Sequence, residues 1–122
     1  MHALYVVTDT ERSVSRMGDG SIHHVAFRVS DENEQDAFRE TVSDLALEPT
    51  PVIERFYFRS VYFPLPKGVL FEVATDDPGF LVDESEENLG TTLCLPPQYE
   101  EYRERIEAEL TPFEPLKDTD DD

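Results

Sequence analysis

Hydrophobic and polar positions alternate in two segments of the chain, residues 21–29 and residues 68–75. Alternation with a period of two predicts β-strands, because successive side chains of a strand point to opposite faces of the sheet. The first segment sets His24, Ala26 and Arg28 against Val25, Phe27 and Val29. The second segment sets Leu70, Glu72 and Ala74 against Val69, Phe71 and Val73. Each predicted strand therefore has one apolar face and one face with ionisable side chains.

The residues between these two segments predict a helix and then one or two further strands. Asp31 and Glu34 fit a capping box. The apolar stripe that follows is Phe38, Val42 and Leu45, with Ala37 and Thr41 alongside. Pro49 and Pro51 cannot continue the helix. Residues 52–63 are rich in aromatic and β-branched side chains, which predicts two short strands or one bent strand.

Within the 52–63 segment, Ser60 and Tyr62 are predicted to share one face, opposite Val61 and Phe63. The predicted order is β-α-β-β-β, which is an α+β domain whose helix covers the apolar side of one sheet. Residues 3–8 predict a short lead-in strand, and residues 98–110 predict a C-terminal helix with an apolar stripe of Tyr102, Ile106 and Leu110. The predicted divisions are a lead-in strand and linker (1–20), the βαβββ module (21–97), and the C-terminal helix with an acidic, disordered tail (98–122).

The chain is small and strongly acidic. Its 122 residues include 28 acidic and 10 basic side chains, which gives a formal net charge of −18. Nucleic acids and anionic membrane surfaces both require a basic footprint, so this composition argues against both as partners. Only Lys67 and Lys117 are lysines. Strong acidity with few lysines is typical of proteins from halophiles, and a halophilic source is our hypothesis.

Repulsion among these negative charges predicts a stability that depends on salt. We expect the melting temperature to rise between low salt and molar KCl, because added ions screen the repulsion. Thermal unfolding followed by circular dichroism tests this, and an unchanged melting temperature would contradict it.

The compartment is predicted from what the sequence lacks. Cys94 is the only cysteine, so an intrachain disulfide cannot form. The apolar run at the N-terminus is too short for a signal peptide and is interrupted by Asp9. No segment approaches the length of a membrane span. The sequence therefore predicts a soluble, cytoplasmic chain.

His24 and Glu72 are candidates for a shared metal site, because both lie on the ionisable faces of predicted strands. A carboxylate within an apolar run requires a partner, since a buried unpaired charge costs roughly 3–5 kcal/mol. A metal ion held by both side chains would provide that partner. Two simpler interpretations stay open at this point: a surface or hydrogen-bonded histidine, and a glutamate on an edge strand or a solvated face.

Several motifs occur in an order that resembles one known family. They are Ser-Ile-His-His-Val-Ala-Phe-Arg-Val at 21–29, Glu-Arg-Phe-Tyr-Phe-Arg-Ser-Val-Tyr-Phe at 54–63, Gly-Val-Leu-Phe-Glu-Val-Ala-Thr-Asp at 68–76 and Pro-Gly-Phe at 78–80. Together they resemble the C-terminal end of the ring-cleaving dioxygenases of the glyoxalase/vicinal oxygen chelate superfamily. The likeness is closest to the hydroquinone-type (MhqO/PcpA-like) branch, and it extends over roughly residues 18–110.

The resemblance implies a single vicinal oxygen chelate module whose curved sheet cradles a divalent metal, most often Fe(II), with Mn, Zn, Ni or Co as alternatives. It implies that His24 and Glu72 are metal ligands. It further implies that His23, Arg55 and Tyr62 orient an aromatic diol or move its protons while O2 opens the ring. Arg55 would offset the charge of a phenolate, and Tyr62 and His23 would act in acid–base steps. Without the family, a surface ion pair and a cross-strand pair also account for Arg55 and Tyr62.

The sequence departs from the family in one respect. Family members are much longer and contain several modules, and their third metal ligand is a histidine near the start of the chain. His2 is the only remaining histidine here, and it matches no family motif. The resemblance therefore implies a homodimer, or a partner chain that carries the N-terminal modules. The alternatives are a glyoxalase-like metal-dependent lyase or isomerase acting as a homodimer, and a non-catalytic truncated module.

Overall fold

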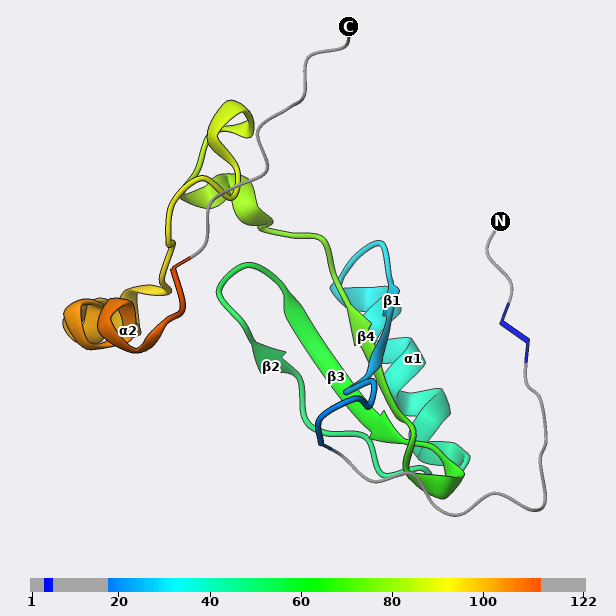
Figure 1. Cartoon of the computed structure of the whole chain (residues 1–122). Helices are drawn as coiled ribbons and strands as arrows, with labels where there is room; N and C mark the ends of the chain where they lie inside the picture. Colours follow the sequence, from blue (N-terminus) through cyan, green and yellow to red (C-terminus); the bar gives the residue numbers. More distant parts are fainter. Residues whose placement is uncertain (1–3, 6–17, 113–122) are drawn as a thin grey trace, which may run out of the picture.

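The computed structural model describes residues 4–5 and 18–112. Four strands and two helices follow one another along the described part of the chain (Figure 1). They are β1 (Val25–Arg28), α1 (Glu32–Asp44), β2 (Ile53–Glu54), β3 (Arg59–Pro64), β4 (Leu70–Ala74) and α2 (Arg103–Glu109). Short 3₁₀ turns occupy Pro66–Gly68, Phe80–Val82, Glu86–Asn88 and Pro97–Tyr102. The predicted α+β class and the β-α-β-β-β order with a C-terminal helix are confirmed.

The strands form one sheet in the order β1-β4-β3-β2. β1 pairs with β4 in parallel, and the other two pairs are antiparallel. In this register, Glu72 of β4 lies between Ala26 of β1 and Tyr62 of β3. α1 lies against one face of the sheet, while α2 lies away from it (Figure 1).

The hydrophobic core lies between α1 and the sheet. Val29, Val42, Phe63 and Val73 form its buried cluster, and Leu47, Leu65 and Phe71 pack against it. The predicted apolar faces of the strands therefore face the helix. The polar residues that alternate with them, including Glu72 and Tyr62, lie on the opposite face of the sheet.

The first turn of α1 is capped as the sequence predicts. The Asp31 side chain accepts a hydrogen bond from the Glu34 backbone N–H at 2.9 Å. Glu34 in turn accepts from the backbone N–H and the hydroxyl of Ser30, at 2.6 and 2.7 Å. These two hydrogen bonds stabilise the carboxylate and lower the pKa of Glu34.

The predicted apolar stripe of α1 is correct at Val42 only, which is buried. Leu45 is 67% exposed, because α1 ends at Asp44, several residues before Pro49, and Leu45 is already the C-cap. Phe38 contacts Phe63 with ring centroids 6.0 Å apart but keeps 40% of its surface exposed. The inward position one turn earlier belongs to a polar residue, Gln35, which is 1% exposed.

The ends of the other predicted elements differ from the structure in a similar way. β1 begins at Val25, so His23 and His24 lie just before the strand rather than within it. Only the second half of the helix predicted at 98–110 is α-helical, because Pro97 starts a 3₁₀ turn that no side chain caps. Its predicted stripe is not buried, since Tyr102 and Leu110 are about half exposed.

Two predicted segments lie mostly or wholly outside the described residues. Of the lead-in strand at 3–8 only Leu4 and Tyr5 are described, without regular secondary structure, and the tail is described only to residue 112. In the described ranges no helix is both long enough and apolar enough to cross a bilayer.

Candidate functional site

Glu72 lies at the centre of the sheet face that α1 leaves uncovered. Its neighbours in the register are Ala26 on β1 and Tyr62 on β3. His24 comes two residues before Ala26, so its side chain is on the same face. The His24 Nε2 atom lies 2.7 Å from Glu72 Oε2. The structure therefore brings together the imidazole and the carboxylate that the sequence singled out on separate strands.

Burial differs sharply across this pair. Glu72 is only 3% exposed, whereas the His24 side chain is 34% exposed. A carboxylate removed from water requires hydrogen-bonded or charged partners. His24 provides one of them, and because about a third of its side chain is exposed, the pair can be reached from the open face.

His23 contacts the second ring nitrogen of His24. The two Nδ1 atoms are 2.8 Å apart, and the rings meet edge to face with centroids 5.1 Å apart. A hydrogen bond of this kind needs a proton on one Nδ1 and a lone pair on the other. The contact with His23 at Nδ1 and the contact with Glu72 at Nε2 together set which nitrogen of His24 carries the proton.

Tyr62 and Arg55 extend the same group of residues. The Tyr62 ring meets the His24 ring edge to face at a centroid distance of 5.8 Å. The Arg55 guanidinium carbon lies 5.5 Å from the centre of the Tyr62 ring, within cation–π range. A tight turn between β2 and β3 carries Arg55, whose N–H donates to the Phe58 carbonyl, and Phe56 adopts the left-handed φ of 71° in this turn. All five residues singled out by the sequence are thus linked by contacts.

Ser60 is a member of this group that the sequence indicated only as a neighbour of Tyr62 on the strand face. It lies on β3 opposite Ala74, diagonal to Glu72 across the strand pair. Ser60 is 0% exposed, and its hydroxyl donates a hydrogen bond to Glu72 Oε1. A cross-strand contact of this kind depends on the register between β3 and β4, which alternation along each strand does not determine.

The donor atoms of His24 and Glu72 fit a divalent cation. An imidazole nitrogen and a carboxylate oxygen are common ligands of Fe, Zn, Ni and Co. Adjacent ligands of an ion bound at about 2.1 Å are roughly 3.0–3.4 Å apart, so Nε2 and Oε2, in direct contact at 2.7 Å, would have to separate by less than about 1 Å to hold an ion. Within residues 4–5 and 18–112, no third His, Cys, Asp or Glu joins this pair at ligand distance. His2 is outside these residues.

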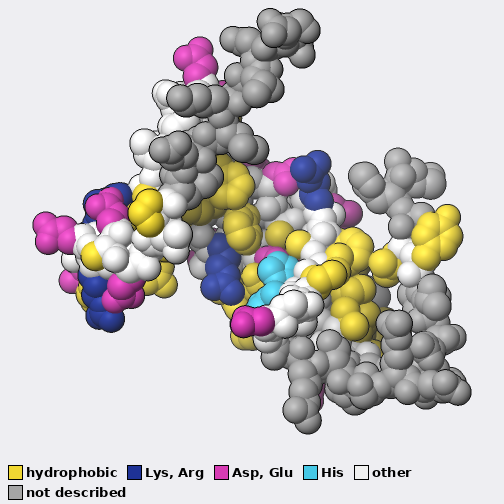
Figure 2. All heavy atoms as spheres, viewed as in Figure 1, with side chains coloured by type: hydrophobic (Ala, Val, Ile, Leu, Met, Phe, Trp, Pro, Cys, Tyr) yellow, Lys and Arg dark blue, Asp and Glu magenta, His cyan; other side chains and the backbone are white. Residues whose placement is uncertain are grey.

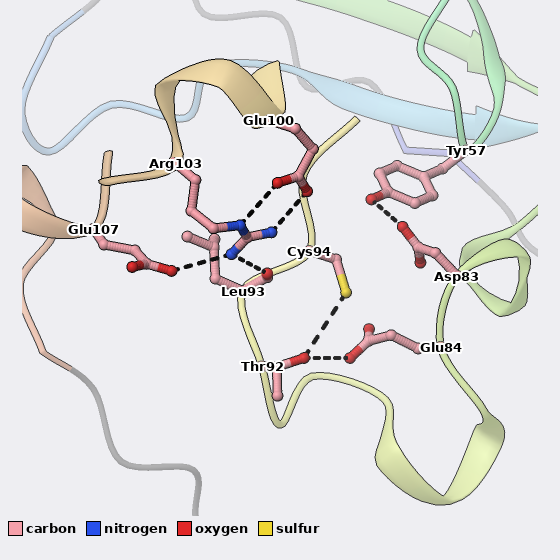
Figure 3. A network of polar contacts seen from close by, with 9 residues as sticks. All are labelled: Tyr57, Asp83, Glu84, Thr92, Leu93, Cys94, Glu100, Arg103 and Glu107. Atoms are coloured by element: carbon pink, nitrogen blue, oxygen red, sulfur yellow. Dashed lines mark hydrogen bonds and ion pairs between the residues drawn. The ribbon is translucent and has the colours of Figure 1, made fainter. Parts of the chain in front are cut away.

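The only three-membered group of potential metal ligands in the described part of the chain lies elsewhere. Asp83, Glu84 and Cys94 place ligand atoms within 4.8 Å of one another (Figure 3). Tyr57 donates a 2.8 Å hydrogen bond to Asp83, and burial together with this bond raises the pKa of Tyr57 to about 12. Burial raises the pKa of the Cys94 thiol, which disfavours the thiolate that binds metals. We assign no site here.

Space for a small molecule exists next to His24. An open pocket of about 440 Å³ is lined by His24, residues 20–22, Val25 and residues 68–70. Ile22, Val25, Val69 and Leu70 make much of its lining apolar. Figure 2 shows the histidines exposed on this face of the molecule, with hydrophobic side chains beside them. The site therefore combines an ionisable pair with an apolar neighbourhood, as ligand sites commonly do.

Named relatives of this chain include two proteins of Bacillus subtilis and one of Sphingobium indicum. The chain is 42% identical over 111 residues to MhqA of Bacillus subtilis (strain 168), which bears the provisional name ring-cleaving dioxygenase; the match covers 91% of this chain and 35% of MhqA. It is 43% identical over 99 residues to MhqO of the same strain, named in the same way, with 81% and 32% covered. The chlorohydroquinone/hydroquinone 1,2-dioxygenase of Sphingobium indicum is 36% identical over 104 residues, with 84% and 32% covered.

The fold also matches a solved structure. A protein of Bacillus subtilis subsp. subtilis str. 168, provisionally described as a dioxygenase, superposes with a TM-score of 0.75 at 43% sequence identity. The match covers 83% of this chain and 33% of that protein. The chain thus spans about a third of the length of the relatives it matches. No protein-family profile matches it.

Proposed function

Since this chain is related in sequence and fold to ring-cleaving dioxygenases, we propose that it forms the part of such an enzyme that holds two ligands of the metal. The observation that carries the proposal is the 2.7 Å approach of His24 Nε2 to Glu72 Oε2 on the open face of the sheet. The proposed substrate is a catechol- or hydroquinone-like aromatic, which is cleaved with O2.

His24 and Glu72 are the proposed metal ligands, and the proposed metal is Fe(II), with Mn, Zn, Ni or Co as alternatives. Two histidines and one carboxylate on one side of an iron leave positions open for substrate and O2. When bound, iron supplies the site at which the diol oxygens and O2 meet. To bind, His24 must present the lone pair of Nε2. Its Nδ1 then carries the proton and donates to His23 Nδ1, 2.8 Å away.

His23, Tyr62 and Arg55 would act on the substrate. With its Nδ1 accepting from His24, neutral His23 keeps its proton on Nε2 and can donate a hydrogen bond from it to an oxygen of the bound substrate. The Tyr62 hydroxyl can hold or move a proton of the diol. Arg55, whose guanidinium lies over the Tyr62 ring, would offset the negative charge of a bound phenolate. These roles are supported by the side-chain types, by the contacts of His23 and Tyr62 with His24, and by the contact of Arg55 with Tyr62.

A second chain is proposed to complete the site. The relatives have about two thirds of their length beyond the part that matches this chain, and His24 with Glu72 supplies only two ligands. We propose that a partner chain resembling this remaining part provides the third ligand and covers the open sheet face. Two copies of this chain would instead place two histidines and two glutamates around one ion, which is the arrangement expected of a glyoxalase-like lyase or isomerase.

The proposal is tested by oxygen consumption. The chain is loaded with Fe(II) without air and mixed with hydroquinone or catechol, with and without a separately produced polypeptide matching the remaining two thirds of a Bacillus relative. We expect O2 uptake equal to the ring-opened product formed, and only when both polypeptides are present. The matched control replaces His24 with alanine, which should remove the uptake.

The other outcomes identify the alternatives. A dimeric chain that binds Zn or Ni tightly and consumes no O2 in any mixture would contradict the dioxygenase and favour the lyase or isomerase. A chain that binds no divalent metal, alone or with the second polypeptide, would contradict both enzymes and leave a non-catalytic module. The oligomeric mass is measured by light scattering in each mixture.

A further inference from the structure

Ser60 has a contact that the proposed function does not use. Ser60 is a fully buried polar residue, and it lies on the face of the sheet that carries the site. It contacts one carboxylate oxygen of Glu72, and His24 contacts the other. Its hydroxyl donates to Oε1 of Glu72, while His24 Nε2 lies 2.7 Å from Oε2. The two carboxylate oxygens therefore have different partners.

This division of partners fixes the Glu72 carboxylate. The last side-chain torsion of a glutamate has a broad, roughly two-fold energy profile, so the backbone does not determine the plane of the carboxylate. A hydrogen bond to Oε1 from a buried hydroxyl on the adjacent strand does determine it. It also satisfies an oxygen that would otherwise be buried without a donor, since Glu72 is 3% exposed.

We propose that Ser60 is a positioning residue that holds Oε1 of Glu72, so that Oε2 alone is presented to a cation beside His24. This inference rests on the proposed metal site at His24 and Glu72. Groups that hydrogen-bond to metal ligands typically change metal affinity by about 10–100-fold when removed. Ser60 would have this effect without touching the ion.

The experiment measures Co²⁺ binding to the complete, metal-free chain by isothermal titration and by the visible ligand-field spectrum of the bound Co²⁺. We expect Ser60→Ala to weaken binding about 10–100-fold and to change the spectrum. Ser60→Thr keeps the hydroxyl and should bind within about 3-fold of the wild type, a difference of less than 1 kcal/mol. If Ser60→Ala does not fold, Ser60→Val, which matches threonine in shape but lacks the hydroxyl, takes its place.

Thr75→Val is the matched control. Thr75 is another buried hydroxyl residue of the same sheet region; it accepts from the Arg59 N–H and donates to the Asp77 carbonyl, and it has no contact with Glu72. This variant should lower the melting temperature and leave Co²⁺ affinity unchanged. A purely structural role of Ser60 would make Ser60→Ala behave like Thr75→Val.

The outcomes separate this inference from the proposed site. If the wild type binds Co²⁺, Glu72→Gln does not, and Ser60→Ala binds as tightly as the wild type with the same spectrum, the Ser60 inference is wrong and the metal site stands. If wild-type binding is absent both alone and with the second polypeptide, or is the same in Glu72→Gln, the metal site is wrong and the inference about Ser60 is lost with it.

Discussion

Replacing Glu72 with glutamine is expected to abolish metal binding while leaving the fold intact. The substitution removes the charged ligand, and the loss of Co²⁺ affinity should exceed the roughly 10–100-fold typical of a residue that only supports a ligand. Glutamine keeps an oxygen that can accept from Ser60 and places an amide near His24, so the local hydrogen bonds survive. Because Glu72 is 3% exposed, removing its charge should leave the melting temperature unchanged or raise it.

Opposite effects on binding and stability are therefore the signature of a ligand. Asp76→Asn provides the matched control, because it removes one carboxylate just beyond the same strand, where Asp76 pairs with Arg28 at 3.0 Å on the exposed surface. Co²⁺ titration and thermal melts of both variants measure the two quantities. If Glu72→Gln binds Co²⁺ as tightly as the wild type, Glu72 has a structural role and is not a ligand. A large fall in its melting temperature would mean the same.

The arrangement of the site could be predicted because it follows from alternation. Successive side chains of a strand point to opposite faces, so Glu72 had to share a face with Leu70 and Ala74, and Tyr62 with Ser60. The apolar faces then had to meet α1, which placed the polar faces together on the other side. Only the register was missing; the pairing of His24 with Glu72 was inferred from the ionisable faces of the two strands, and the resemblance to a known family implied the same pair.

Contacts that cross between elements could not be predicted in this way. The bond from Ser60 to Glu72 requires Ser60 to lie opposite Ala74, which depends on where the turn at Pro66–Gly68 ends. Leu45 was expected to be buried from its spacing to Val42, yet α1 stops one residue earlier. Gln35 was not expected to be buried. The helical period predicts burial from apolar residues alone, so it cannot identify a polar side chain that is buried because it hydrogen-bonds to the sheet.

The burial of Gln35 leads to the second large effect. Its side-chain amide donates to the carbonyl of Arg59 at 2.8 Å and to the carbonyl of Val73 at 3.0 Å, joining α1 to β3 and β4. Gln35→Glu keeps the shape but replaces the donor with an acceptor that faces two carbonyl oxygens. We expect the free energy of unfolding to fall by about 3 kcal/mol or more, since a buried carboxylate without a donor is strongly unfavourable. Urea unfolding at neutral pH measures it.

Gln35→Met separates the two contributions at this position. Methionine has a similar length but no donor, so it loses two hydrogen bonds of about 1 kcal/mol each without introducing a charge. It also removes the Gln35 side-chain oxygen, which is buried without a partner among the described residues and costs stability in the wild type. We therefore expect Gln35→Met to cost less than about 2 kcal/mol and to lie between the wild type and Gln35→Glu. Equal losses in both variants would mean that packing volume, rather than donation to the two strands, decides the stability at this position.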